Sequence, residues 1–263
     1  MSCKICGHTV SLLFEKKILG KYKVGYYQCA HCGFMQTEQP YWLNEAYQSA
    51  ITALDLGLAN RNLVLAPIVE TIIKAFFNSN ALFLDYGGGY GLLVRMLRDK
   101  GFRFYREDKF CENLFAKNFD VTDLPAVPGF ELITAFEVFE HLPEPLQEIE
   151  KMLTYGKSIL FSTELQPAAG LADWWYISPE TGQHVSFYSY PSLVEIARKF
   201  NLHLYSNRRN IHLLTPAKLS YPLFRVLARR KPALLFNAVF PNKRSLLMDD
   251  HSMVKQKLHS QEV

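Results

Sequence analysis

Four of the five cysteines form two matched pairs near the start of the chain. Cys3 and Cys6 lie in one Cys-x-x-Cys-Gly string, and Cys29 and Cys32 lie in a second, with 22 residues between the pairs. Two cysteines at this spacing can bend around one ion, and four thiolates suit tetrahedral Zn²⁺ at about 2.3 Å per bond. Because four protein ligands complete the coordination, the pattern predicts a structural zinc site rather than a catalytic one.

The residues between the pairs favour a hairpin. Phe14 to Gln28 alternate in polarity and contain strand-forming residues, which predicts a small zinc ribbon over residues 1–40. Redox-active pairs are the alternative, but a redox Cys-x-x-Cys normally stands alone beside a β-α-β unit. His8 and His31 are interpreted as bystanders, and Cys111 as a small buried apolar residue.

A glycine-rich turn follows a short apolar run. The run Ala81-Leu82-Phe83-Leu84 ends in Asp85, and an amphipathic helix begins at Leu92. The turn between them carries alternate glycines, Gly87, Gly89 and Gly91. A strand, a glycine turn and a helix open a doubly wound nucleotide-binding fold, and glycine lets the backbone approach a ligand closely. A dinucleotide fingerprint needs glycine at position 92, and a phosphate loop needs Gly-Lys-Ser/Thr, so neither pattern fits.

Two later strands are predicted to bring acids to the same edge of the sheet. Residues 102–106 are strand-like and end at Glu107 and Asp108; an acid there can accept hydrogen bonds from both hydroxyls of a ribose. We favour Asp108 over Glu107. Residues 130–136 form the next buried strand, followed by the string Glu137-Val138-Phe139-Glu140-His141-Leu142.

The order of glycine turn, acidic strand end and E-V-x-E-H-L string resembles the class I S-adenosylmethionine-dependent methyltransferases. The resemblance spans residues 81–163 and implies an α/β fold with a Rossmann-like, doubly wound, seven-stranded sheet. It implies a methyltransferase with S-adenosylmethionine bound at the glycine turn. We therefore expect a zinc ribbon at 1–40, a helical segment at 41–80, a cofactor-binding core with an acceptor-site insertion at 81–215 and a basic, apolar helical extension at 216–263.

The resemblance also implies the residues around the cofactor. The glycine turn would curve under its amino-acid part, Asp108 would hold the ribose, and Phe136 would pack near the methionine. Phe119 would lie against the adenine and Asp120 would accept its amine. Arg61 would pair with the methionyl carboxylate, or is a surface arginine. The complete expected set is Asp85, Gly87, Gly89, Gly91, Asp108, Phe119, Asp120, Phe136, Glu137 and Arg61.

Histidine suits the removal of a proton from an acceptor hydroxyl, because its usual pKa is about 6.5. His184 ranks first as the catalytic residue and His141 second, with a structural, hydrogen-bonded histidine as the alternative for His141. Residues 174–187 are similar to a segment of a bacterial branch that often carries an N-terminal cysteine module. That branch implies a sugar or nucleotide-sugar acceptor in a cell-surface or secondary-metabolite pathway. Trp174, Trp175 and Tyr176 would line the acceptor site or form a core patch.

Charge is distributed unevenly along the chain of 263 residues, which is 49% hydrophobic and carries a net charge of +4. Residues 217–244 hold seven basic side chains and no acidic one, which leaves 22 basic and 25 acidic residues elsewhere. This is not the overall basic surface of a general nucleic-acid binder, so DNA is not expected as a partner. The basic, apolar segment predicts a peripheral membrane contact, a homodimer contact or packing against its own domain. Residues 245–263 are expected to be frayed.

The start of the chain shows no secretory signal, and no apolar run approaches the ~20 residues of a membrane span, so a cytoplasmic location is expected. A small-molecule acceptor is the first functional hypothesis. A ribosomal or transfer RNA methyltransferase that docks RNA through its zinc ribbon is the second, and a non-catalytic cofactor-binding scaffold is the third.

Overall fold

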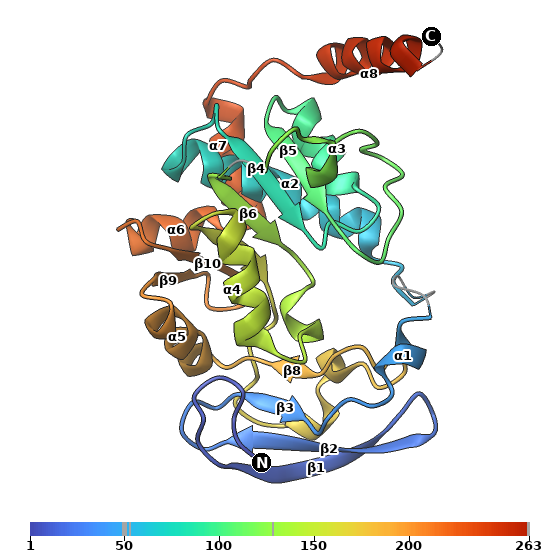
Figure 1. The fold of residues 1–263 in the computed structure, drawn as a ribbon. Coiled ribbons are helices and arrows are strands. Elements are labelled where there is room, and N and C mark those ends of the chain that lie inside the picture. Colours follow the sequence, from blue (N-terminus) through green and yellow to red (C-terminus); the bar gives the residue numbers. More distant parts are fainter. Residues whose placement is uncertain (49–51, 53, 128, 262–263) are drawn as a thin grey trace.

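The computed structural model describes residues 1–48, 52, 54–127 and 129–261. Its main feature is a large β-sheet covered by helices (Figure 1). The described strands of this sheet run in the order β5-β4-β6-β7-β10-β9. They are β4 (Leu82–Tyr86), β5 (Arg103–Glu107), β6 (Leu132–Ala135), β7 (Ile159–Ser162), β9 (His203–Ser206) and β10 (Ile211–Thr215). The first four are parallel, whereas β10 is antiparallel to both β7 and β9. This arrangement confirms the predicted doubly wound sheet, and its β9–β10 edge is an antiparallel pair.

The described part of this sheet has six strands where the sequence analysis expected seven. The place of the seventh, beside β5, holds a single parallel bridge between Arg106 and Asp120. The backbone is not extended on either side of that bridge. Asn118 has a left-handed φ of 71°, and a 3₁₀ turn begins at Val121. The segment therefore pairs with the sheet at one point and does not form a strand.

Helices cover both faces of the large sheet. Adjacent strand residues point to opposite faces. Accordingly, Phe83 packs in one apolar cluster with helices α2, α3, α6 and α7, and Leu84 packs in another with α4 and α5. The helices are α2 (Leu58–Phe76), α3 (Leu92–Asp99), α4 (Pro145–Tyr155), α5 (Tyr190–Lys199), α6 (Tyr221–Leu227) and α7 (Arg230–Val239). Burial on both faces explains why the strands read as short apolar runs.

A second, smaller sheet lies at the N-terminal side of the molecule (Figure 1). Strands β1 (Val10–Ile18) and β2 (Tyr22–Cys29) form the predicted antiparallel hairpin, and β3 (Met35–Thr37) pairs with β2. The fourth strand, β8 (Ser186–Phe187), comes from the segment that follows β7 and pairs with β3. The sheet thus joins residues 1–40 to the segment that follows β7, which was predicted to contain the acceptor-site insertion. The boundaries of the four expected segments remain a prediction.

The helical segment before the large sheet is shorter than its pattern suggested. The first helix is the single turn α1 (Leu43–Ala46), and α2 begins at Leu58. Trp42 is held by its indole N–H, which donates to the carbonyl of Gly182 at 2.8 Å. Ile51, which falls in the segment 41–80 predicted to be helical, lies outside the described residues.

The C-terminal residues form a helix rather than the frayed end expected from the sequence. Helix α8 (Leu247–Gln261) projects from the body of the molecule, and its first turn is tied to α3 (Figure 1). Asp250 is buried and accepts from the Arg98 guanidinium at 2.5 and 2.8 Å. No helix in the described ranges is long and apolar enough to cross a membrane.

Candidate active site

The glycine turn forms one wall of a cavity of about 750 Å³. Gly87, at the end of β4, has a φ of +66°, a conformation that side chains with a Cβ rarely adopt. A Cβ on Gly87 would also lie 2.7 Å from a methyl carbon of Val138. Bare backbone at this point therefore lets the turn curve beneath a ligand.

Two acids at the end of β5 line the same cavity. One oxygen of Asp108 accepts the Gly89 N–H at 2.9 Å, and the other accepts the N–H groups of Phe110 and Cys111, both at 2.8 Å. Asp108 therefore holds the glycine turn in place and also forms part of the cavity wall. The neighbouring Glu107 has an ion pair with Lys151 at 3.8 Å, and burial raises the pKa of Glu107. Both carboxylates remain candidates for holding the ribose.

Asp85 supports the glycine turn from below. It is fully buried at the end of β4 and accepts a hydrogen bond from the hydroxyl of Thr134 at 2.6 Å. Burial raises the pKa of Asp85 to about 7. One of its oxygens would lie 2.8 Å from a Cβ on Gly88, so the turn passes directly over this carboxyl group.

The expected adenine-binding pair, Phe119 and Asp120, requires a correction, because neither side chain lines the cavity. Phe119 is buried, with the guanidinium of Arg98 3.6 Å from its ring centre. Asp120 accepts from the buried guanidinium of Arg106 at 2.6 Å, and Arg106 also donates to the carbonyl of Gly89. Arg106, held by Asp120, thus supports the glycine turn from outside the cavity.

At the end of β6, Phe136 and Glu137 line the cavity. Glu137 has a left-handed φ of 55°, and its N–H donates to the hydroxyl of Ser162 at 2.8 Å while its carboxylate accepts from the same hydroxyl at 2.7 Å. The left-handed backbone at the strand end is held by these two bonds. Arg61 also lines the cavity. It donates two hydrogen bonds to Asp55, at 2.6 and 2.7 Å, and lies 3.6 Å from a Glu137 oxygen.

The two candidate histidines meet at the cavity wall. The rings of His141 and His184 lie 4.8 Å apart, centre to centre, and are nearly perpendicular. His184 Nδ1 lies 2.6 Å from the carbonyl oxygen of Tyr176, and the hydroxyl of Tyr47 lies 3.0 Å from His141 Nδ1. Burial lowers the pKa of His141 to about 3 and that of His184 to about 4. Both rings are therefore neutral near pH 7.

Several residues that line the cavity were not predicted from the sequence. Tyr47, Tyr90 and Phe110 line the wall, and Tyr47 stacks on Phe110 with ring centres 5.7 Å apart. The sequence offered no signal for them beyond aromatic character, because they come from three separate segments. Trp175 lines the cavity and is 72% exposed, whereas Trp174 packs in the core of the N-terminal sheet.

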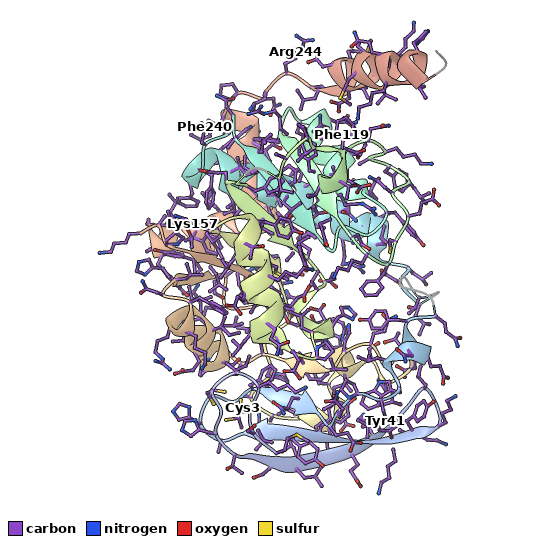
Figure 2. All side chains as sticks on the ribbon, in the orientation of Figure 1. Cys3, Tyr41, Phe119, Lys157, Phe240 and Arg244 are labelled. Atoms are coloured by element: carbon purple, nitrogen blue, oxygen red, sulfur yellow. The ribbon has the colours of Figure 1, made fainter. Side chains whose placement is uncertain are left out.

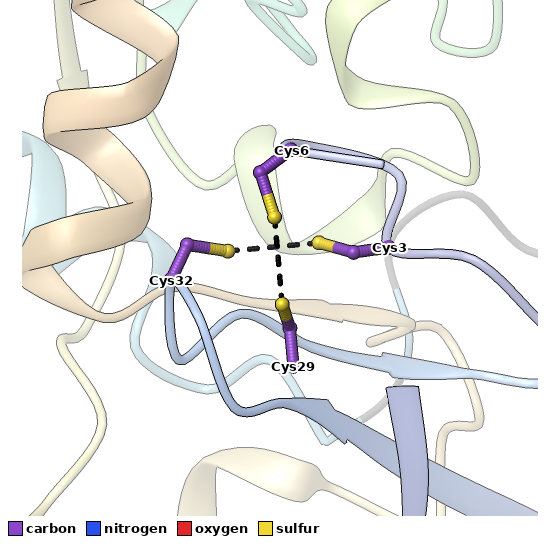
Figure 3. A group of neighbouring side chains, drawn as sticks. All are labelled: Cys3, Cys6, Cys29 and Cys32. Atoms are coloured by element: carbon purple, nitrogen blue, oxygen red, sulfur yellow. Dashed lines mark hydrogen bonds between the residues drawn. The ribbon is translucent and has the colours of Figure 1, made fainter. Parts of the chain in front are cut away.

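The four paired cysteines converge on one point (Figure 3). Cys3 Sγ lies 3.6 Å from Cys32 Sγ, and Cys6 Sγ lies 3.4 Å from Cys29 Sγ. Disulfide sulfurs are about 2.05 Å apart, so these are free thiols. Zn–S bonds of about 2.3 Å in a tetrahedron place sulfurs roughly 3.8 Å apart, close to the observed distances.

Comparison with known proteins places the chain in a family. A model of the methyltransferase domain matches residues 58–207, more than half of the chain. The doubly wound sheet and the glycine turn define a class I methyltransferase fold. The chain belongs to the methyltransferase domain family. No curated protein matches the sequence.

Solved structures with similar folds are distant. The mitomycin 7-O-methyltransferase is 15% identical with a TM-score of 0.44, covering 67% of this chain and 60% of its own. An O-methyltransferase family 2 protein from Planctomyces limnophilus, in complex with apigenin, is 17% identical with a TM-score of 0.46, covering 62% and 61%. A chain from the complex of the Haloferax volcanii Trm112 activator with a putative methyltransferase is 13% identical with a TM-score of 0.47, covering 69% and 98%. The chain therefore spans about 60% of the length of the first two.

Replacing Gly87 with alanine is expected to weaken binding of S-adenosylhomocysteine at least tenfold, since the added Cβ meets Val138 and the positive φ becomes strained. Isothermal titration calorimetry measures the affinity. Gly129→Ala is the matched control, because its Cβ would meet nothing within 4 Å. Equal affinities for the two variants would contradict this role of the turn.

Proposed function

We propose that this methyltransferase methylates a small polar molecule of the sugar or nucleotide-sugar type, in a cell-surface or secondary-metabolite pathway. The observation that carries the proposal is the single cavity of about 750 Å³. Its wall contains both the glycine turn and a second group of polar and aromatic side chains. That second group is Tyr47, His141, Trp175, Tyr176 and His184. A pocket of this volume is suited to a cofactor with a small acceptor beside it.

The residues at the cavity fit S-adenosylmethionine. When bound, this compound supplies a methyl carbon activated by a cationic sulfur. The bare backbone of the glycine turn gives room for its amino-acid part, and Asp108 or Glu107 would hold the ribose hydroxyls. Phe136 would pack near the methionine chain. Arg61 would face its carboxylate, with Asp55 and, more weakly, Glu137 fixing the position of Arg61.

The protein's contribution to transfer is alignment and proton removal. Alignment of two bound reactants contributes on the order of 7–11 kcal/mol. His184 is our first candidate for removing the acceptor proton. Because a carbonyl oxygen only accepts hydrogen bonds, His184 Nδ1 must donate to Tyr176, which leaves Nε2 with a free electron pair. His141, beside it, would bind the acceptor hydroxyl.

An RNA substrate is less well supported by the charges of the N-terminal sheet. Four of the five lysines in residues 1–40 form ion pairs with acids, and Lys17 is the exception among the described residues: Lys4 pairs with Glu144, Lys16 with Asp173, Lys21 with Glu45 and Lys23 with Glu15. Binding to RNA depends on cations that are free to replace counterions around phosphate. The cavity lined by aromatic rings favours a small acceptor instead.

The test is incubation with isotopically labelled S-adenosylmethionine and fractionated extract, followed by mass spectrometry of the labelled product. We expect label in the small-molecule fraction, and a decrease of at least tenfold in the rate for His184→Asn with unchanged affinity for S-adenosylhomocysteine. His203→Asn, at an exposed position on β9, is the control. Label confined to RNA would overturn the proposal.

We also propose that Cys3, Cys6, Cys29 and Cys32 hold one structural Zn²⁺. Zinc binding to four thiolates contributes directly to folding, so its removal by a strong chelator is expected to lower the melting temperature and expose β8 to hydrogen exchange. Metal analysis of the purified protein and differential scanning calorimetry measure the effect. Cys29→Ser should lose zinc, whereas Cys111→Ser, outside the cluster, should retain it. Full zinc content in Cys29→Ser would contradict this ligand set.

A further inference from the structure

Glu140 is buried in an unusual way. Its side chain is 0% exposed, and among the described residues neither carboxyl oxygen has a partner within hydrogen-bond distance, although the hydroxyl of Tyr176 lies close by. Buried polar groups are nearly always paired, because an unpaired carboxylate loses its hydration without compensation. The two oxygens therefore point to a ligand that supplies positive charge.

Two histidines surround this carboxylate. One donor atom from each of Glu140, His141 and His184 lies within 4.8 Å of the other two. The first two belong to the 3₁₀ turn Phe139–His141, and His184 belongs to the segment before β8. The N–H of Val185 donates to the Glu140 carbonyl at 2.9 Å, which fixes the two segments against each other. The juxtaposition is thus built by the backbone.

Backbone carbonyl groups next to Nδ1 of His141 and His184 fix how the two imidazole rings are oriented. His184 Nδ1 donates to the Tyr176 carbonyl, and His141 Nδ1 lies 3.2 Å from the carbonyl oxygen of Gln183. Histidines that bind metals commonly donate one ring N–H to a carbonyl and coordinate through the other nitrogen. Here the Nε2 atoms are the nitrogens left for a ligand.

We propose that Glu140, His141 and His184 bind a divalent transition-metal ion, in a site distinct from the four cysteines. Two imidazole nitrogens and one carboxylate suit Mn²⁺, Fe²⁺ or Zn²⁺ and leave coordination positions open. Because His141 and His184 also line the cavity, an acceptor oxygen can take an open position.

The site deepens the proposed function and depends on it for its role in catalysis. A metal-bound hydroxyl loses its proton more readily than a free one. The O–H bond breaks and the proton leaves to solvent. The oxygen forms a bond to the methyl carbon, while the C–S bond breaks and sulfur keeps its electron pair. With the ion bound, His184 is a ligand and no longer the proton acceptor.

Mn²⁺ alone is the probe, because it prefers oxygen and nitrogen ligands over thiolates and so distinguishes this site from the cysteine cluster. One equivalent of Zn²⁺ per chain is added first, because four thiolates bind it more tightly than two imidazoles and one carboxylate do, and metal analysis confirms that no second zinc is bound. Electron paramagnetic resonance of free Mn²⁺ then counts the sites. We expect one Mn²⁺ per chain in the parent and a loss of affinity of at least tenfold in Glu140→Gln and in His184→Gln.

Two controls separate metal binding from a structural role. Glu164→Gln changes another half-buried carboxylate, at the end of β7, and should bind Mn²⁺ as the parent does. Glu140→Gln removes an unpartnered acid, so without Mn²⁺ its melting temperature should equal or exceed that of the parent. The rise in melting temperature that Mn²⁺ causes in the parent should be absent from this variant.

The outcomes are distinguishable from failure of the proposed function. No Mn²⁺ bound by the parent, or equal affinity in Glu140→Gln, overturns the metal site, whereas failure to bind S-adenosylhomocysteine would overturn the proposed function. Calorimetry with S-adenosylhomocysteine is therefore run on the same samples.

A second inference concerns an exposed apolar surface on α6 and α7. Its apolar members are Leu223, Val226, Leu234, Leu235, Val239 and Phe240, each at least 45% exposed. Figure 2 shows Phe240 at the edge of the molecule, and the cations of α6, α7 and the turn between them are exposed: Arg225, Arg229, Arg230 and Lys231. Exposed apolar patches of this kind usually mark a contact surface.

We infer that this surface, which we call the α6–α7 surface, binds an anionic lipid bilayer. Exposed apolar side chains interspersed with cations match the boundary between acyl chains and acidic headgroups. A symmetric dimer through the same surface would bring the cations of two copies together, with no acid in residues 217–244 to balance them. Charge therefore favours the lipid surface over a second copy.

Flotation with vesicles of phosphatidylcholine, with and without phosphatidylglycerol, tests this inference. We expect binding only to the anionic vesicles, weakened by added salt and by roughly fivefold for each of Arg229→Gln and Arg230→Gln. Leu235→Glu should abolish binding, whereas Leu12→Glu, at an apolar position 54% exposed on β1, should not. Concentration-dependent dimers in light scattering without vesicle binding would overturn it.

Discussion

The site depends on one constraint, which is that residues 183–188 are held between the N-terminal sheet and the turn that follows β6. On one side, β8 pairs with β3 through Gln36 and Ser186. On the other, the Ser186 hydroxyl donates to the carbonyl of Leu142 at 2.6 Å, and the Tyr188 hydroxyl donates to that of Phe139 at 2.9 Å. These bonds place His184 against His141. Without β3 beside it, the segment would have partners on one side only.

Because of this constraint, the cysteine cluster affects the positions of cavity residues that it does not contact. Cys29 ends β2, and the loop to β3 contains Cys32, whose carbonyl accepts a hydrogen bond from Ser189 at 2.6 Å. Ser189 is in turn the N-cap of α5. On the other side of the cluster, Lys4 donates to the carbonyl of Pro143, directly after the E-V-x-E-H-L string. A metal at the cysteines would thus position both segments that supply the histidines, although it would lie outside the cavity.

The parts of the fold that the sequence predicted are those determined by local patterns. The Asp85 strand, the glycine turn and the hairpin between the cysteine pairs follow from periodicity and spacing within a few residues. The absence of the seventh strand could not be predicted in this way. It results from the left-handed φ at Asn118 and the 3₁₀ turn that begins at Val121, which leave no extended segment long enough for a strand. Phe119 and Asp120 were misplaced for a related reason. Their partners, Arg98 and Arg106, are polar residues on other elements, and sequence spacing does not show such contacts.

Glu140 shows most clearly where sequence reasoning ends. In the string Glu137-Val138-Phe139-Glu140-His141 it is the second of two acids, and the sequence led us to place only Glu137 beside the cofactor. The 3₁₀ turn rotates Glu140 inward, and the chain returns 44 residues later to place His184 beside it. A buried acid without a partner is costly unless a ligand repays that cost. Backbone hydrogen bonds hold the 3₁₀ turn and the segment before β8 together, so the fold fixes the position of Glu140. A ligand for its carboxylate would explain why an acid occupies this buried position.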